Sequence, residues 1–325
     1  MDIEQYLLTR EHAIRLGVFL AVFALVALWE IAAPRRQAIL SKAQRWSSNI
    51  SLMALNTLLL RLVFPLATVG VAAFGEASGW GLLNHFQVPS WLAVPIAVIA
   101  LDFAIWLQHV VIHAVPAFWR LHQVHHADLD YDLTTGTRFH PIEMLLSILI
   151  KFAAVVTLGP PVVAVVIFEV LLNATSMFNH GNIRIPRPIN GALGWFIVTP
   201  DMHRIHHSVE PDETNSNFGF TLPWWDRLFG THRAQPRAGH DAIIIGVRGR
   251  TDPREVARLD GMLLMPFKGK VSSYAINDRR WPAVIATEQA GTALVTRHES
   301  NLNGCDQSNG SDRSASQTPV RLNER

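Results

Sequence analysis

Eight histidines form three short clusters whose spacing suits metal binding. The clusters read HxxxH, HxxHH and HxxHH, and they comprise His109 and His113, then His122, His125 and His126, then His203, His206 and His207. Residues three and four positions apart share one face of a helix, so we expect each cluster to point its imidazoles at one spot. Neutral imidazole is the commonest nitrogen ligand for transition metals. A lone histidine on an apolar face would rather be a core residue, but three clusters in order predict a metal site.

Two apolar stretches carry further polar residues at helical spacing. Asp102 precedes His109 by two turns, and an acid in such a helix usually faces the protein interior with a partner. It is a candidate to hold the free ring nitrogen of a ligand histidine, although pairing with a donor on another helix is equally open. Glu169, Asn173, Ser176 and His180 repeat the spacing of Asp102, Trp106, His109 and His113, which is four, three and four residues. We favour His180 as a ninth ligand, with Glu169 and Asn173 as outer partners; hydrogen bonding between helices without a metal is the alternative.

His140 stands directly before Pro141, which favours the start of a helix there. Three roles stay open for this histidine: a metal ligand, a donor to a ligand, or a neighbour of the helix N-terminus. Downstream, residues 214–230 hold several aromatic side chains. These suit either the interface of a membrane or the packing of a cap outside it.

The elements that position these residues are expected to be membrane helices. Of the 325 residues, 49% are hydrophobic and 17% are charged, a composition typical of membrane proteins. Apolar runs long enough to span the bilayer cover 16–33, 50–74 and 91–113. The run 144–177 is broken by Gly159-Pro160-Pro161, which predicts a helical hairpin. The expected fold is therefore all-α: an integral membrane bundle of about three spans plus a hairpin, with a cytosolic helical cap carrying a histidine-rich di-metal site.

Charge and cysteine content narrow the remaining possibilities. The net charge of +2 is too small to indicate nucleic-acid binding. Arg35, Arg36, Lys42 and Arg45 follow the first span, so the positive-inside rule places that loop, and with it the histidine clusters, in the cytoplasm. Cys305 is the only cysteine, so a metal site built from several thiolates is excluded. The first apolar run lacks the features of a cleaved signal and is interpreted as a retained anchor.

These features predict four regions along the chain. Residues 1–90 are the N-terminal anchor helices, and 91–235 are the catalytic domain with the histidine clusters. Residues 236–297 form a C-terminal cytosolic extension. The tail 298–325 is rich in Ser, Asn, Gly and charge and is expected to be disordered.

Six strings resemble the fatty acid hydroxylase and sterol desaturase superfamily. They are DFAIWLQHVVIH (102–113), WRLHQVHH (119–126), RFHPIE (138–143), FNHGN (178–182), TPDMHRIHHS (199–208) and NFGFTLPWWDRLFGTH (217–232). The resemblance covers the middle of the chain, and order, spacing and flanking residues agree. Two departures stand out: Val110 replaces an arginine common after the first histidine, and the fused cytochrome b5 domain of some relatives is missing.

The resemblance implies a membrane-bound, non-haem di-iron enzyme that uses O2 to hydroxylate or desaturate a lipid such as a sterol or fatty acyl chain. The eight clustered histidines would be metal ligands, His180 occupies a position where the family often has another, and zinc can replace iron on expression. Electrons would come from a separate ferredoxin, cytochrome b5 or reductase. The alternatives are a membrane zinc hydrolase, which would need fewer histidines and commonly an HExxH string, and a metal transporter, whose ligands would lie at the bilayer midplane.

Overall fold

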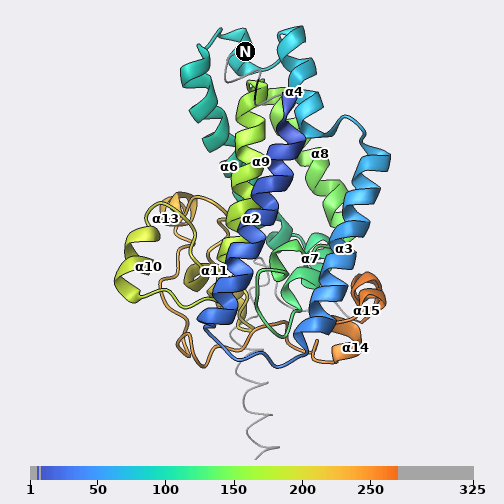
Figure 1. The fold of residues 1–325 in the computed structure, drawn as a ribbon, viewed down its shortest axis with the longest axis vertical. Coiled ribbons are helices and arrows are strands. Elements are labelled where there is room, and N and C mark those ends of the chain that lie inside the picture. The colour runs from blue at the N-terminus through green and yellow to red at the C-terminus, as the bar shows by residue number, and fades with distance from the viewer. Residues whose placement is uncertain (1–5, 7–8, 270–325) are drawn as a thin grey trace, which may run out of the picture. The chain divides into compact units, whose positions relative to one another are not determined.

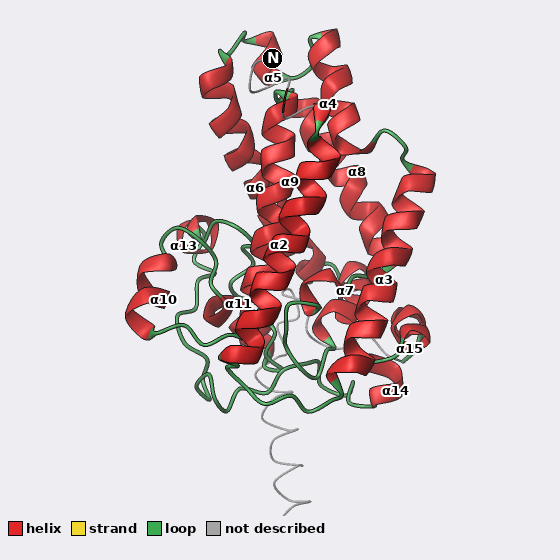
Figure 2. Ribbon diagram, viewed as in Figure 1, coloured by secondary structure: helices red, strands yellow, loops and turns green. Residues whose placement is uncertain are grey.

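The computed structural model describes residue 6 and residues 9–269, and every regular element in that part of the chain is helical (Figure 2). This confirms the all-α prediction. In chain order the elements are α2 (Glu11–Ala32), α3 (Lys42–Val63), α4 (Ala67–Ser78), α5 (Leu82–His85), α6 (Ser90–Ala114), α7 (Pro116–His126), η1 (Thr135–Thr137), α8 (Pro141–Leu158), α9 (Val162–Asn179), α10 (Arg187–Leu193), α11 (Pro200–His206), α12 (Pro211–Thr214), α13 (Trp224–Leu228), α14 (Pro253–Val256), α15 (Leu259–Leu264) and η2 (Met265–Phe267).

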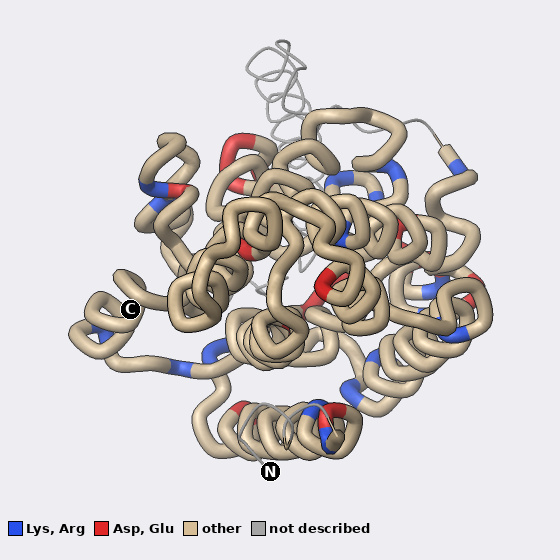
Figure 3. Tube along the Cα trace, turned by 90° about the horizontal axis from the view of Figure 1, so that it is seen from above, with Lys and Arg blue, Asp and Glu red and all other residues tan. Residues whose placement is uncertain are grey.

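Five helical segments of the described chain are long and apolar enough to cross a membrane: α2, the run from α3 to α5, α6, α8 and α9. Seen from above, charged residues are sparse along most of the trace (Figure 3). Many large apolar side chains on these helices face outward, including Leu25, Leu58 and Leu107. Such surfaces on membrane-length helices suit a lipid environment. The predicted third span coincides with α6 to within one residue, and the first with α2 apart from an earlier start.

The predicted second span, 50–74, lies within the membrane-length run from α3 to α5, but this run is not one continuous helix. Helix α3 begins earlier, at Lys42, and the chain breaks between Val63 and Ala67, where Pro65 lies. Proline has no backbone N–H to donate, and it disfavours helical geometry in the residue before it. Phe64 accordingly leaves the helical region, with φ −128° and ψ 76°.

The predicted break in the hairpin is confirmed, and it depends on two glycines. Gly159 ends α8 with φ +64°, a left-handed conformation that suits glycine, and α9 begins after the two prolines. Gly81, with φ +92°, lies against this turn so closely that a Cβ there would come within 2.2 Å of the Gly159 nitrogen. The turn and the loop before α5 can therefore meet only through backbone.

Helix α9 lies at the centre of the bundle, with α2, α4 and α6 packed around it, while α8 packs against α3, α4 and α6 (Figure 1). A buried apolar cluster joins four of these helices, through Ala72 of α4, Leu101 and Ile105 of α6, Val155 of α8, and Val165 and Phe168 of α9. Because α6 and α9 are held in this core, their last turns have fixed positions. Both helices run directly into histidines of the predicted site.

The short helices outside the membrane-length ones, α7 and α10 to α15, form what we call the cap, and a second apolar cluster holds part of it together. It contains Trp119 and Val124 of α7, Leu52 of α3 and the methionines 262 and 265 near α15. Part of the predicted extension 236–297 therefore packs on the elements that carry the second histidine cluster. The remaining predictions for that extension, and the one for the tail 298–325, fall on residues 270–325, which lie outside the described chain.

Candidate metal centre

Nine buried histidines converge where the bundle meets the cap, and they divide into two groups. The five-histidine group consists of His109, His113, His122, His126 and His206, and the four-histidine group of His125, His180, His203 and His207. Within each group the candidate ligand atoms all lie within 4.8 Å of one another. The structure thus brings together all eight clustered histidines and His180.

The division into groups differs from the expectation that each cluster points at one spot. His122 and His126 of α7 enter the five-histidine group, whereas His125 between them enters the other. In the third cluster the assignment is reversed, because His203 and His207 join the four-histidine group and His206 joins the five. The two groups are therefore direct neighbours, and the rings of His126 and His207 stack with centroids 4.4 Å apart.

Outer hydrogen bonds fix the orientation of rings in the five-histidine group. The Nδ1 atoms of His109 and His206 each lie 2.8 Å from a backbone carbonyl, that of Phe218 and that of Ser216. Nδ1 of His122 lies 2.6 Å from Oε1 of Glu143. A carbonyl or carboxylate oxygen accepts only, so each of these Nδ1 atoms carries the proton and donates it. In the neutral ring, Nε2 is then left with a lone pair.

These lone pairs face one another. Nε2 of His109 lies 3.1 Å from Nε2 of His122 and 3.0 Å from Nε2 of His206. With all three rings neutral, none of these nitrogens has a proton to share, and the lone pairs repel one another unless a cation lies among them. The donor set therefore fits a metal ion.

The four-histidine group repeats this arrangement around His180. Its Nδ1 lies 2.7 Å from the carbonyl of Ser176, one helical turn earlier on α9, so Nε2 again presents the lone pair. Nε2 of His203 and Nε2 of His125 lie 3.1 and 3.3 Å from it. Both ring nitrogens of His207 and of His126 are buried and make no hydrogen bond within the described chain. Buried polar atoms are rarely left this way without an ion or water to satisfy them.

Burial also favours the neutral form of six of these rings. It lowers the pKa of six cap and loop histidines, and repulsion from neighbouring imidazoles lowers most of them further: His125, His126, His180, His203, His206 and His207. For His180 the pKa falls to about 4. A neutral imidazole is the form that binds a metal.

The predicted outer residues lie elsewhere. Asp102 accepts a hydrogen bond from Nε1 of Trp225 at 2.9 Å and does not contact a histidine in the described chain. Glu169 pairs with Arg15 at 2.8 Å and with Lys151 at 3.6 Å, and Asn173 is exposed and donates to the carbonyl of Glu169. His140 belongs to neither group. It caps α8, where its Nδ1 accepts from the Ile142 backbone N–H at 3.2 Å.

Glu143, which contacts His122, was missed by the sequence reasoning. It lies in the first turn of α8 and is buried. The available signal was that it is the only acid in the apolar run from Pro141 to Leu158, and that an acid so placed needs a partner.

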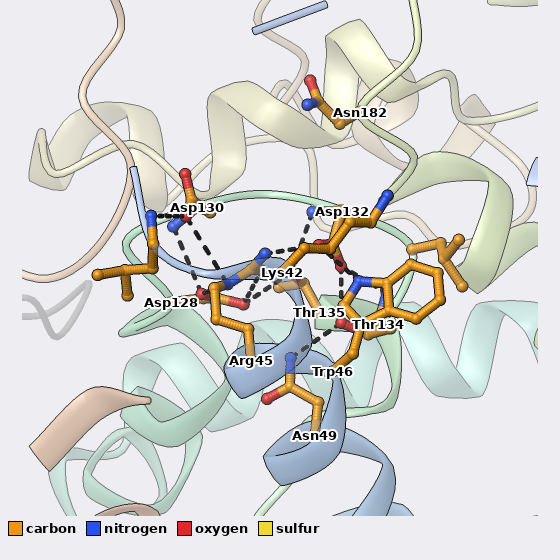
Figure 4. Close-up of polar contacts among 12 residues, drawn as sticks. Lys42, Arg45, Trp46, Asn49, Asp128, Asp130, Asp132, Thr134, Thr135 and Asn182 are labelled. Carbon is orange, nitrogen blue, oxygen red and sulfur yellow. Dashed lines mark hydrogen bonds and ion pairs between the residues drawn. The ribbon is translucent and has the colours of Figure 1, made fainter. Parts of the chain in front are cut away.

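The loop after the second cluster is held by one buried arginine. Arg45 of α3 donates to both carboxylate oxygens of Asp128, at 2.8 and 2.6 Å, and to Asp132 at 2.5 Å (Figure 4). Burial alone would raise the pKa of Asp128, but Arg45 and Arg138 lower it to about 2. Arg45 was counted among the basic residues that indicate a cytoplasmic loop, but its guanidinium pairs with aspartates inside the protein.

Tyr131 connects this loop to the four-histidine group. Its hydroxyl donates to the carbonyl of Asn179 at 2.6 Å, and its ring lies beside His180 and His207, with centroids 5.6 and 5.2 Å away. The loop therefore forms one wall of the site without supplying a ligand candidate.

The model for the fatty acid hydroxylase family matches residues 94–231. This stretch is a fatty acid hydroxylase domain. It contains all nine histidines of the two groups, together with the loops whose carbonyls orient them. The resemblance found in the sequence is thereby confirmed.

Curated relatives agree with the domain assignment. The chain is 25% identical over 297 residues to ornithine lipid hydroxylase OlsE of Rhizobium tropici, covering 87% of this chain and 85% of that protein. It is 34% identical over 137 residues to alkylglycerol monooxygenase of Xenopus tropicalis, covering 41% of this chain and 29% of that protein. It is 25% identical over 185 residues to Delta(7)-sterol 5(6)-desaturase erg3B of Aspergillus fumigatus, covering 54% and 50%.

No solved structure matches this chain. The three relatives are lipid oxidoreductases by name, and this hydroxylase domain is that of an oxidoreductase. The relatives and the five membrane-length helices together indicate that the protein is an integral membrane enzyme of that class. The histidine groups and the family point to the use of a metal, with iron indicated by the family.

Proposed function

We propose that the protein is an O2-dependent di-iron oxidoreductase that hydroxylates, or desaturates, a C–H bond of a membrane lipid. The observation that carries the proposal is the pair of adjacent histidine groups inside a fatty acid hydroxylase domain. Their ring nitrogens are buried and lie close to one another, so each group is suited to one metal ion.

The donor set favours two irons over a single zinc. A catalytic zinc takes three protein ligands, usually with a carboxylate as base, and leaves one position open. Nine imidazoles in two groups are too many for that site, and Glu143 is engaged with His122. Imidazole binds iron and zinc alike, so zinc can fill the same groups on expression. The hydroxylase domain is what selects iron in this proposal.

A bound iron pair would supply the reduction of O2 that breaks an unactivated C–H bond. The overall hydroxylation consumes the C–H bond, O2, two electrons and two protons, and it yields an alcohol and water. Desaturation with the same inputs yields a double bond and two waters. The electrons come from a separate donor of the ferredoxin, cytochrome b5 or reductase type, and we place the histidine groups on the cytoplasmic side, where such a donor is available.

The protein's own residues position and shield the site. Phe218 and Phe220 lie beside His109, with ring centroids 5.5 and 4.9 Å away, and Phe220 also lies 5.5 Å from His203. These apolar rings cover the imidazoles of His109 on α6 and His203 on α11, and they exclude water from that side of the site. Glu143 and the carbonyls of Ser216 and Phe218 hold the imidazoles in the tautomer that leaves Nε2 free.

The substrate class we propose is a polar membrane lipid with an acyl chain. The match to the ornithine lipid hydroxylase extends over 87% of this chain, well beyond the hydroxylase domain, whereas the other matches are shorter. An ornithine lipid is therefore the first compound to assay. Comparison of the lipids of cells with and without the protein would reveal the product, including whether it is an alcohol or an alkene.

The decisive variant is His125→Ala. His125 belongs to the four-histidine group, so the variant should lose bound iron and O2-dependent, reductant-dependent lipid oxidation in membranes. The matched control is His85→Ala, because His85 ends α5 and belongs to neither group. The control should keep both properties. If His125→Ala retained iron and activity at the wild-type level, its role as a ligand would be excluded.

A further inference from the structure

Six large apolar side chains form an exposed patch outside the long helices. We call it the aromatic patch, and it consists of Ile189, Trp195, Phe196, Trp224, Leu228 and Phe229, each between 43% and 71% exposed. The first three lie in or just after α10, and the others in or just after α13. The two segments are joined directly, because Nε1 of Trp224 donates to the carbonyl of Trp195 at 2.7 Å. Patches of this kind mark sites of interaction.

The patch is fixed against the side of a membrane-length helix. Nε1 of Trp106, on α6, donates to Asp226 of α13 at 3.0 Å, and its ring stacks on Phe229 with centroids 4.8 Å apart. One turn earlier, Phe103 lies 4.9 Å from the ring of Trp225. In Figure 1, α10 and α13 accordingly lie on the same flank of the bundle.

The position of these contacts along α6 sets the depth of α13. Helix α6 has 25 residues, and about 20 residues are enough to span the hydrocarbon core of a bilayer. Even if all of the remaining residues of α6 protruded from the membrane on the side of the cap, the hydrocarbon core would still extend to about His109. Phe103 would then lie about 9 Å inside it, at about 1.5 Å per residue. A segment packed on Phe103 is therefore at the level of the lipid.

Charge along the two segments agrees with this position. The only acid between 186 and 197 or between 222 and 230 is Asp226, which is buried. The basic residues are Arg187, which is exposed at the start of α10, and Arg227, whose guanidinium lies 4.4 Å from the ring centroid of Trp195. Aromatic and basic side chains without acids are typical of elements that lie in the interface of a bilayer.

We propose that the aromatic patch is embedded in the bilayer, so that α10 and α13 form a lobe lying in the membrane interface beside α6. Leu107 and Val111 of α6 are also exposed apolar residues. The cap is then held to the membrane by its own side chains as well as by the spanning helices. Of the two interpretations open for the aromatic residues 214–230, this assigns the membrane interface to the exposed ones.

The test places a fluorescent label on the patch and asks what surrounds it. Cys305 is the only cysteine, so Cys305→Ser gives a background in which Leu228→Cys is the single labelling site. Leu25→Cys on α2 is the lipid-facing reference, and Arg258→Cys, whose native side chain is 57% exposed in the cap, is the water-facing reference. The full chain is reconstituted in nanodiscs of phosphatidylcholine and phosphatidylglycerol, with and without brominated acyl chains, and iodide serves as the aqueous quencher.

At position 228, brominated lipid should remove at least about half of the fluorescence that it removes at position 25, because interfacial elements are buried about 5–10 Å into the headgroup and acyl boundary. Iodide should quench this label far less than the label at position 258. Strong quenching by iodide without quenching by bromine would show a water-exposed surface and overturn the proposal. Protection from both quenchers would show that a second copy of the chain or another protein covers the patch, and it would overturn the proposal equally.

Discussion

Glu143 offers the sharpest test of how the imidazoles are oriented. Its Oε1 accepts from Nδ1 of His122 at 2.6 Å, and both side chains are buried. Replacing Glu143 with Ala removes the acceptor and leaves the ring of His122 free to change its tautomer or turn. We expect weaker metal binding, although Glu143 belongs to neither ligand group.

The size of the effect follows from the kind of contact. Loss of an outer partner of a metal-bound histidine typically costs about 10 to 100-fold in metal affinity, which corresponds to about 1.4–2.8 kcal/mol. The short distance and the burial place Glu143→Ala towards the upper end of that range. Glu143→Gln keeps an oxygen that can accept from Nδ1 but loses the charge, so we expect a loss of less than about tenfold, since neutral acceptors form weaker hydrogen bonds than ionised ones.

The assay is anaerobic competition for Fe(II) between the purified protein in detergent and a coloured chelator. The matched control is Glu169→Gln, which alters another buried carboxylate of the hairpin. Glu169 contacts Arg15 and Lys151, and it lies eleven residues, or about 16 Å, before His180 along α9. The control should keep wild-type affinity even where its thermal stability falls.

Thermal unfolding of the metal-free proteins separates a loss of affinity from a loss of folding. The reasoning would be refuted if Glu143→Ala, folded at the assay temperature, bound Fe(II) as tightly as the wild type. It would also be refuted if Glu169→Gln lost affinity to the same extent, because burial of a carboxylate rather than contact with His122 would then be the cause.

Three further predictions concern positions around the site. His140→Ala should keep its iron and lose only about 1 kcal/mol of stability, as for a lost helix cap, so iron analysis showing depletion would contradict its placement. Arg45→Met should remove the nearest cation from buried Asp128 and Asp132 and lower the unfolding free energy by about 3–5 kcal/mol, measured by thermal unfolding in detergent; an unchanged midpoint would count against it. Gly81→Ala should be more destabilising than Gly79→Ala in the same measurement. Both residues have positive φ, but a Cβ on Gly79 meets nothing within 4 Å, whereas one on Gly81 meets the backbone of Gly159.

The sequence predicted the ligand candidates because their signal is local. Spacing of three and four residues on α6 and α7 is enough to gather imidazoles, and apolar runs are enough to locate the helices that carry them. The assignment to groups is not local. His203 and His206 are three residues apart, as are His122 and His125, yet the members of each pair enter different groups. Which side of a short helix faces which group depends on how the other helices are packed.

The outer partners show the same limit more clearly. Asp102, Glu169 and Glu143 are all acids in apolar helices, and nothing in the sequence ranks them. Asp102 accepts a hydrogen bond from Trp225, and Glu169 forms ion pairs with two basic residues on α2 and α8, so neither is available to a histidine. Only Glu143 is brought to an imidazole, because α8 begins beside α7. Pairings between distant parts of the chain decide the role of each acid.

The segment from Ser216 to Phe218 explains how loops contribute to the site without supplying ligands. The carbonyls on either side of Asn217 accept from His206 and His109, both in the five-histidine group. Asn217 itself has φ +51°, which asparagine tolerates better than most residues, and its side chain binds the backbone of Met202 and Arg233. Asp226 accepts from the backbone N–H of Phe218 and from Trp106 of α6, which fixes the same segment to a membrane helix. A short turn, held at both ends, thus sets the tautomers of two imidazoles carried by two different helices.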